Sequence, residues 1–168
     1  MTVSIRPATR DDVDFLAGLY TDEDVRPFLA AGGSYDREGI LERLEQDPDE
    51  GGLLVVELEG ESAGALGWEL RNRRSGIAHV SGLAVHPDFR GRRLADDAAR
   101  LLQHHLIRER GLHRIEMEIY GFNERAHRHA ERAGFVREGV KRQAYRLGDG
   151  WTDSVLYAMV AEDLDAPR

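Results

Sequence analysis

The stretch HVSGLAVHPDFRGRRLADDAARLL, residues 79–102, predicts a strand, a turn and a helix in succession. Residues 80–85 are mostly apolar, as in a buried strand, and Pro87 ends that strand because proline lacks the N–H that a strand ladder needs. From Leu94 onward, apolar residues recur at helical spacing. The arginine- and glycine-rich turn at residues 90–93 lies at the positive end of this helix, where backbone N–H groups bind phosphate. The stretch therefore favours an anion site, although an ordinary strand-to-helix connection has the same outline.

Length and composition favour a single-domain protein without disulfides, membrane spans or a nucleic-acid partner. The chain has 168 residues, no cysteine and a net charge of −8. This length suits one domain, residues 1–168, and the missing cysteines exclude disulfides. Because there is no apolar run of membrane length and no signal segment, we expect a cytoplasmic protein without a membrane partner. The acidic balance argues against nucleic acid as the main partner.

The remaining chain divides into alternating strand and helix patterns. Helices are predicted at residues 9–20, 34–46 and 123–133, and strands at residues 3–6, 53–59, 62–70, 114–120, 135–147 and 151–160. With the strand and helix of residues 79–102, this order predicts an α+β fold. We expect one mixed sheet of about seven strands flanked by about four helices.

Other charged residues gather in three places. The segments around the first two predicted helices are acidic, at Asp22, Glu23, Asp24, Asp36 and Glu38. The last predicted hairpin is basic, at Arg137, Lys141, Arg142 and Arg146, which we interpret as a solvated face. Five histidines (His104, His105, His113, His127 and His129) lack the regular spacing of metal ligands, so no metal site is expected.

The C-terminal third carries the most specific motifs. These are Asn123-Glu124-Arg125-Ala126, Ala133-Gly134-Phe135, Glu138-Gly139 and Gly150-Trp151-Thr152-Asp153. Together with the turn at residues 90–95 and the order of elements, they resemble the GNAT superfamily of acyl-coenzyme A dependent N-acyltransferases over nearly the whole chain. Within it they are similar to the branch that contains ribosomal-protein N-terminal acetyltransferases. The resemblance implies splayed central strands and acetyl-CoA as the acyl donor.

The resemblance also implies a set of cofactor-binding residues. The splayed strand would hold the pantetheine arm through Leu83, Ala84 and Val85, and the turn would hold the pyrophosphate through Arg90, Gly91, Arg92, Arg93, Leu94 and Ala95. Arg93 departs from the family, which has glycine there. Its β-carbon could clash or forbid a positive φ, or its guanidinium could reach the phosphates, and we expect retained but altered binding. Asn123 matches an asparagine beside the cofactor arm and is also a plausible helix N-cap.

Catalysis needs a base for the attacking amine and an acid for the departing thiolate. His79 matches a family glutamate that acts as base, though a histidine hydrogen-bonded to the backbone fits equally. Glu69 is the second candidate for the base, and Ser81, on the same side of its strand as His79, can order a water.

The position of the family's acid, a tyrosine seven residues after the asparagine, holds Ala130 here. The neighbouring His129 points about 100° away on a helix. Tyr120 or Tyr145 could supply a hydroxyl instead, or solvent could serve.

Two functions follow from these motifs. The first is an acetyl-CoA dependent N-acetyltransferase that transfers an acetyl group directly to a primary amine of a small molecule or a peptide N-terminus. Its acceptor would enter between the first two helices and the last hairpin, where the acidic residues favour a cation. The alternative, suggested by Arg93 and Ala130, is a non-catalytic protein of the same fold that binds a ligand or protein partner. The exposed final hairpin would allow pairing into a homodimer.

Overall fold

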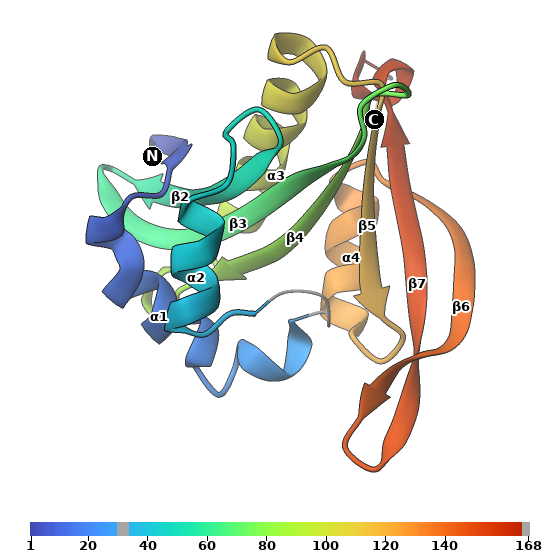
Figure 1. Ribbon diagram of the computed structural model, residues 1–168, viewed down its shortest axis with the longest axis horizontal. Coiled ribbons are helices and arrows are strands. Elements are labelled where there is room, and N and C mark those ends of the chain that lie inside the picture. The colour runs from blue at the N-terminus through green and yellow to red at the C-terminus, as the bar shows by residue number, and fades with distance from the viewer. Residues whose placement is uncertain (30–33, 166–168) are drawn as a thin grey trace.

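Seven strands form one mixed sheet in the computed structural model, which describes residues 1–29 and 34–165 (Figure 1). The strands are β1 (Val3–Pro7), β2 (Gly51–Leu58), β3 (Glu61–Asn72), β4 (Ile77–Val85), β5 (Arg114–Tyr120), β6 (Val136–Leu147) and β7 (Gly150–Val160). Their order across the sheet is β1-β2-β3-β4-β5-β7-β6. The β4–β5 pair is parallel and the other neighbouring pairs are antiparallel. The predicted α+β fold is confirmed.

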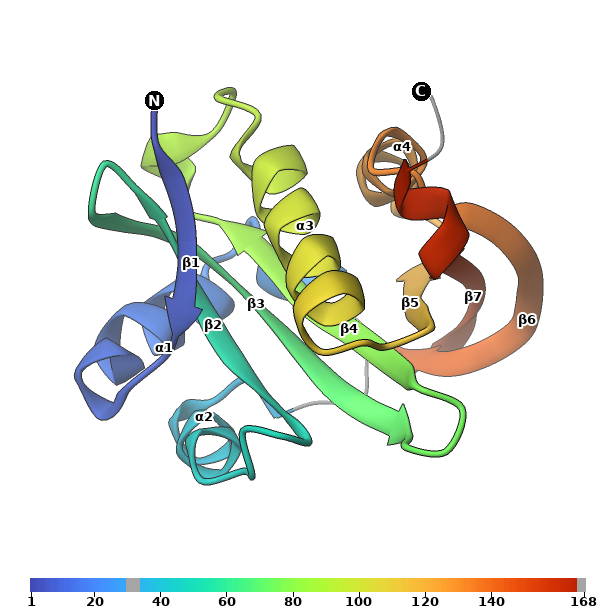
Figure 2. The same cartoon turned by 90° about the horizontal axis from the view of Figure 1, so that it is seen from above.

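Within the described residues, four α-helices cover the two faces of the sheet, two on each side (Figure 2). One face carries α1 (Val13–Thr21) and α2 (Arg37–Leu44), and the other carries α3 (Leu94–His104) and α4 (Glu124–Arg132). Each face has its own apolar core, so both sides of the central strands are buried. No helix in the described part of the chain is both long and apolar enough to span a bilayer.

Several element ends differ from the sequence prediction. The second helix begins only at Arg37, because the Asp36 carboxylate accepts a hydrogen bond from Gly39 N at 2.8 Å and caps the helix there. The predicted first helix starts as a 3₁₀ turn at Arg10–Asp12 before α1. Short 3₁₀ turns at Arg26–Phe28, Pro87–Phe89 and Ala161–Asp165, and a π-helical turn at His105–Glu109 after α3, were not predicted.

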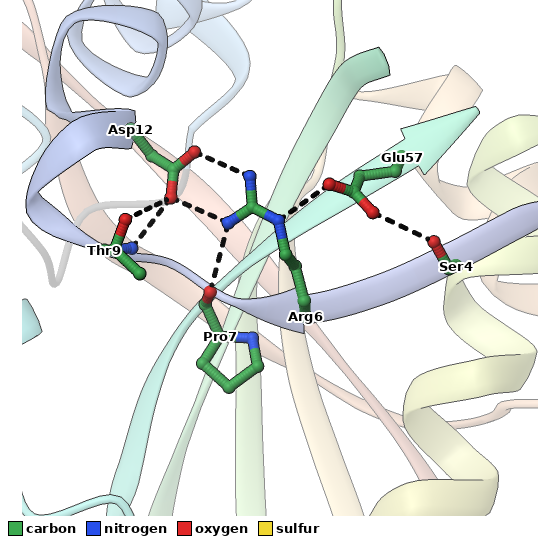
Figure 3. Close-up of polar contacts among 6 residues, drawn as sticks. All are labelled: Ser4, Arg6, Pro7, Thr9, Asp12 and Glu57. Atoms are coloured by element: carbon green, nitrogen blue, oxygen red, sulfur yellow. Dashed lines mark hydrogen bonds and ion pairs between the residues drawn. The ribbon is translucent and has the colours of Figure 1, made fainter. Parts of the chain in front are cut away.

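A polar cluster around Arg6 fixes α1 against the edge of the sheet (Figure 3). The Arg6 guanidinium donates to both Asp12 oxygens at 2.8 Å and to Glu57 at 2.7 Å. The Asp12 carboxylate also accepts from Thr9 N at 2.8 Å, and the hydrogen bond from Arg6 is the main cause that lowers the pKa of Asp12 to about 2. The cluster therefore joins β1, β2 and the start of α1.

A bulge in β4 changes which residues face each core. Ser81 pairs with Gly67 and Ala84 with Ala65, so three steps along β4 oppose two along β3. Gly82, inside the bulge, has a φ of +66°, which glycine adopts without the steric cost of a side chain. The Tyr20 hydroxyl donates to Gly82 O at 2.9 Å and ties the bulge to α1.

Before β4 reaches this bulge, it separates from β5. Their pairing runs only from Ile77 with Arg114 to His79 with Glu116. Past these residues the two strands diverge, as Figure 1 shows toward the bottom of the view. The splayed central strands expected from the sequence are therefore present, and the opening lies between residues 80–85 of β4 and residues 117–120 of β5.

Candidate active site

The opening between the two strands leads into a cleft of about 910 Å³. The cleft is bounded by β4, β5, the start of α3 and one side of α4. Ten of the residues proposed from the sequence line it: Ser81, Leu83, Ala84, Val85, Arg90, Gly91, Arg93, Leu94, Ala95 and Asn123. Arg92 is outside the lining and lies over the Phe89 ring, 5.7 Å from its centroid. His79, Glu69 and Tyr120 are also outside it.

Arg90 offers two hydrogen-bond donors to the cleft. Its Nη1 donates to Asp24 at 3.1 Å, which brings the segment after α1 to the edge of the cleft. Its Nε and Nη2 are buried and have no hydrogen-bond partner among the described residues. Because a buried donor without an acceptor is costly, these two atoms fit an anionic group bound in the cleft.

Arg93 takes the backbone conformation that glycine would have. It is the N-cap of α3, with φ +57° and ψ +16°, in the left-handed region. The side chain therefore does not forbid the positive φ, although this conformation costs on the order of 1 kcal/mol for a residue with a β-carbon. The exposed side chain also lines the cleft, so the turn keeps its shape and gains a cation.

The pair Arg93→Gly and Arg93→Ala separates the backbone from the charge. We expect both variants to bind acetyl-CoA about tenfold more weakly, because each loses one charge-assisted contact. Only the glycine variant relieves the left-handed strain, so only its melting temperature should rise. Titration calorimetry and thermal unfolding measure the two effects, and tighter binding by Arg93→Gly would mean that the arginine obstructs the site.

An Asp–His pair joins α3 to α4 in the cleft wall. His129 Nδ1 lies 2.8 Å from Asp96 Oδ1, and Arg132 donates to both Asp96 oxygens at 3.2 and 3.3 Å. Burial acts to raise the pKa of Asp96, but the hydrogen bonds from Arg132 and His129 hold it below its ordinary value. Burial also lowers the pKa of His129, against the pull of Asp96. His129 Nε2 is buried with no hydrogen-bond partner among the described residues.

The sequence prediction did not assign this pair a role. Ala130, which stands at the family's tyrosine position, is fully buried in the core, whereas His129 lines the cleft. The sequence did contain a sign that His129 faces the cleft. Asn123, Ala126 and His129 are spaced three residues apart, which puts them on one side of a helix, and all three line the cleft. Asn123 also caps α4, since its side chain accepts from Ala126 N at 3.1 Å, so both of its predicted roles are compatible.

On the face that carries α1 and α2, three polar residues lie in register across the sheet. Glu69 of β3 pairs with His79 of β4, and His79 pairs with Glu116 of β5. Burial, followed by the charge of Arg71, lowers the pKa of His79, while Glu69 and the carboxylates of β5 oppose that shift. His79 is the last residue of β4 that pairs with β5, and its burial favours the neutral imidazole. Glu69 forms an ion pair with Arg71 at 2.5 Å.

Glu118 is a site residue that the sequence prediction missed. It lines the cleft from β5, and its carboxylate accepts from Tyr145 at 2.8 Å, Ser154 at 2.9 Å and Lys141 at 2.5 Å. Burial acts to raise the pKa of Glu118, but these three donors hold it below its ordinary value. Burial, followed by the hydrogen bond to Glu118, raises the pKa of Tyr145 to about 12. In the sequence, residues 115–119 alternate between apolar and acidic, which places Glu118 on the polar face of its strand but does not indicate where the strands separate.

The remaining aromatic and histidine residues lie as follows. Tyr120 is buried, with its ring 5.4 Å from that of Phe122 and 5.7 Å from that of Tyr145. His104 and His105 contact Glu109, and His127 contacts Tyr157. Within residues 1–29 and 34–165, the acidic and histidine side chains form no group suited to hold a metal ion.

Comparison with known proteins agrees with this architecture. A family model described as the acetyltransferase (GNAT) domain matches residues 2–136, from β1 to the start of β6. The chain belongs to the GNAT acetyltransferase family. As a GNAT acetyltransferase it uses acetyl-CoA as the acetyl donor and transfers the acetyl group to an amine. The family membership does not favour the alternative of a non-catalytic protein.

Individual relatives within the GNAT family are distant in sequence. The N-acetyltransferase YnaD of Bacillus subtilis (strain 168), described as uncharacterized, is 23% identical over 148 residues, covering 87% of this chain and 78% of YnaD. The spermidine N-acetyltransferase of Vibrio cholerae, in complex with CoA and spermine, has a TM-score of 0.84 and 18% identity, covering 96% of this chain and 97% of that one. A GNAT acetyltransferase from Bacillus anthracis has a TM-score of 0.81 and 21% identity, with 96% of each chain covered. At these identities the structural likeness shows the GNAT fold alone.

Proposed function

We propose that residues 1–168 act as a single GNAT domain that acetylates the primary amine of a small molecule or a peptide N-terminus. The observation that carries this proposal is the cleft between β4 and β5, which has donors without hydrogen-bond partners among the described residues on one side of the sheet and a carboxylate on the other. Acetyl-CoA supplies an activated acetyl thioester. The chain's own residues bind it, hold the amine and move the proton.

The cofactor would be held by the residues predicted from the sequence. Leu83, Ala84 and Val85 offer backbone groups from the splayed strand to the pantetheine arm. The turn that includes Arg90, Gly91, Arg92, Arg93, Leu94 and Ala95 offers backbone N–H groups to the pyrophosphate, and Arg90 and Arg93 add cationic side chains. Asn123 lies along the same cleft, and His129 Nε2 adds a free hydrogen-bonding atom in its wall.

We assign the acceptor amine to the opposite face of the sheet. Glu118 is ionised and would hold the acceptor as an ammonium ion. His79, kept neutral by burial, would take the proton that the nitrogen must lose before attack, with Ser81 ordering a water between them. Tyr120, beyond Glu118 on the same face of β5, is the proposed proton donor to the leaving thiolate, because Ala130 has no proton to give.

The charges of the cleft support a cationic acceptor. Glu118 in the cleft and Asp24 at its edge favour a cationic amine, and the Vibrio cholerae enzyme of the same fold is described as binding spermine. A peptide N-terminus is the second class, supported by the C-terminal motifs that resemble the branch of ribosomal-protein N-terminal acetyltransferases. We further propose that the enzyme is cytoplasmic and pairs through the β6–β7 hairpin as a homodimer.

Calorimetric titration tests the proposal first. Acetyl-CoA should bind with micromolar affinity, and the protein should then release free thiol from acetyl-CoA when supplied with polyamines or short peptides. Absence of binding at millimolar acetyl-CoA would overturn the proposal.

Arg90→Ala should weaken acetyl-CoA binding by about 1–3 kcal/mol, because it removes from the cleft a guanidinium with two donors that have no hydrogen-bond partner among the described residues. The matched control is Arg92→Ala, since Arg92 belongs to the same turn but lies over Phe89, outside the lining. Titration calorimetry of both variants measures the difference. Equal affinity in the two variants would remove Arg90 from the cofactor site.

A further inference from the structure

Lys141 forms an ion pair with Glu118, the carboxylate that we propose binds the acceptor amine. It is the only lysine in the sequence, so its amino group is the only primary amine on a side chain. Its Nζ lies 2.5 Å from Glu118 Oε1, with 54% of the lysine side chain exposed and 14% of the glutamate side chain exposed. The structure therefore already holds one primary ammonium against a carboxylate of the cleft.

The backbone of β6 is shaped to make this contact. Lys141 pairs with Ser154 and Tyr145 with Thr152, so four steps along β6 oppose two along β7. Gln143, inside this bulge, has a φ of +50°, and its N–H donates to Asp153 at 2.8 Å. The bulge brings Lys141 to one oxygen of Glu118 and Tyr145 to the other.

The proposed proton acceptor, His79, pairs with Glu116, which lies two residues before Glu118 on β5 and on the same face of the strand. Glu118 is one of the charges that act on His79, which stands at the last paired position before the splay. Lys141 thus carries a primary amine, as the proposed acceptor does, and it binds the same carboxylate. The charge of that carboxylate also acts on the proposed base, His79. Its exposed stem allows the amino group to move from Glu118 toward the cleft.

We propose that the enzyme acetylates its own Lys141 when no acceptor amine is present. The inference rests on the proposed role of Glu118 as the carboxylate that binds the acceptor ammonium. In this step the Nζ–C bond forms and the C–S bond of the acetyl thioester breaks. Of the three ammonium protons, one stays on the amide nitrogen, one ends on the thiol of coenzyme A, and one passes to solvent.

Acetylation would change the site that performs it. An acetylated Lys141 has no charge and no longer forms an ion pair with Glu118. The carboxylate would then be open to an external ammonium, so the modified enzyme should bind cationic acceptors more tightly than the unmodified one.

Intact-mass measurement and peptide mapping after incubation with acetyl-CoA alone test the proposal. We expect one acetyl group on Lys141, formed at a rate independent of protein concentration. Glu118→Gln should slow the labelling by at least about tenfold, because the variant loses the charge-assisted contact that holds the Lys141 ammonium. In the double variant Lys141→Arg/Arg142→Lys, the new lysine at the exposed neighbouring position should stay unlabelled.

The result also distinguishes this inference from the proposed function. An enzyme that turns over external amines but leaves Lys141 unmodified after incubation with acetyl-CoA alone would overturn self-acetylation and keep the proposed function. Labelling only at the N-terminal amine, equal labelling of heat-denatured protein, or a rate that rises with protein concentration would overturn it as well. Absence of transfer to both Lys141 and external amines would overturn the proposed function.

Discussion

His79→Gln is expected to lower kcat by about 10²–10⁴-fold with little change in the KM of either substrate, the usual contribution of a general base. Glutamine keeps a hydrogen-bonding side chain of similar length at the register position between Glu69 and Glu116. It cannot take a proton. Steady-state kinetics with a saturating amine separates the effect on kcat from the effect on KM.

The pH profile supplies the second measurement for His79. Because burial lowers its pKa below the ordinary value of 6.5, the neutral form that accepts protons persists into mildly acidic solution. Activity of the parent enzyme should therefore fall as the pH drops through that lowered pKa, and this acidic limb should vanish in His79→Gln. An unchanged limb in the variant would remove His79 from the mechanism.

Unfolding must be measured over the same pH range. A histidine with a lowered pKa in the folded protein binds a proton more readily when unfolded, so stability also decreases as the pH falls below about 6.5. A melting temperature that stays above the assay temperature throughout assigns the limb to catalysis. Glu69→Gln is the control within the same row of residues, because Glu69 is already paired with Arg71 and should affect kcat much less.

The parts of the fold that follow from local pattern were predictable from the sequence. The strand at Arg114–Tyr120 matches its prediction at both ends, and the order of elements is as expected. Helix ends were less predictable, because a single cap decides them, as Asp36 does for α2. The bulge at Gly82 was not predicted, since it depends on pairing between β3 and β4 that no local pattern encodes.

The candidate site shows the same division. The turn at residues 90–95 was found by its motif, but the left-handed conformation of Arg93 required the structure, because arginine rarely adopts it. Glu118 and His129 were missed because their importance comes from tertiary neighbours: Lys141, Tyr145 and Ser154 for one, and Asp96 for the other. The helical angle showed that His129 is not a direct substitute for the tyrosine, but it did not indicate that His129 faces α3.

Glu118→Gln should raise the KM for cationic amines and lower kcat/KM by a factor of roughly 10–150. This factor corresponds to a loss of about 1.5–3 kcal/mol of transition-state stabilisation, because an amide cannot hold the ammonium as an ion pair. Tyr145→Phe is the matched control, since it removes one donor to the same carboxylate but leaves the charge. Acetyl-CoA binding should stay within about twofold of the parent in both variants, because Glu118 lies on the acceptor face.

The same variant gives an independent readout through His79. The negative charge of Glu118 acts to raise the pKa of His79, so its loss should move the acidic limb of the pH profile to lower pH. Tyr145→Phe keeps that charge and should leave the limb in place. A variant with a raised KM and an unmoved limb would mean that Glu118 contacts the amine too far from His79 to share one site. In that case the base would have to be sought elsewhere on the acceptor face.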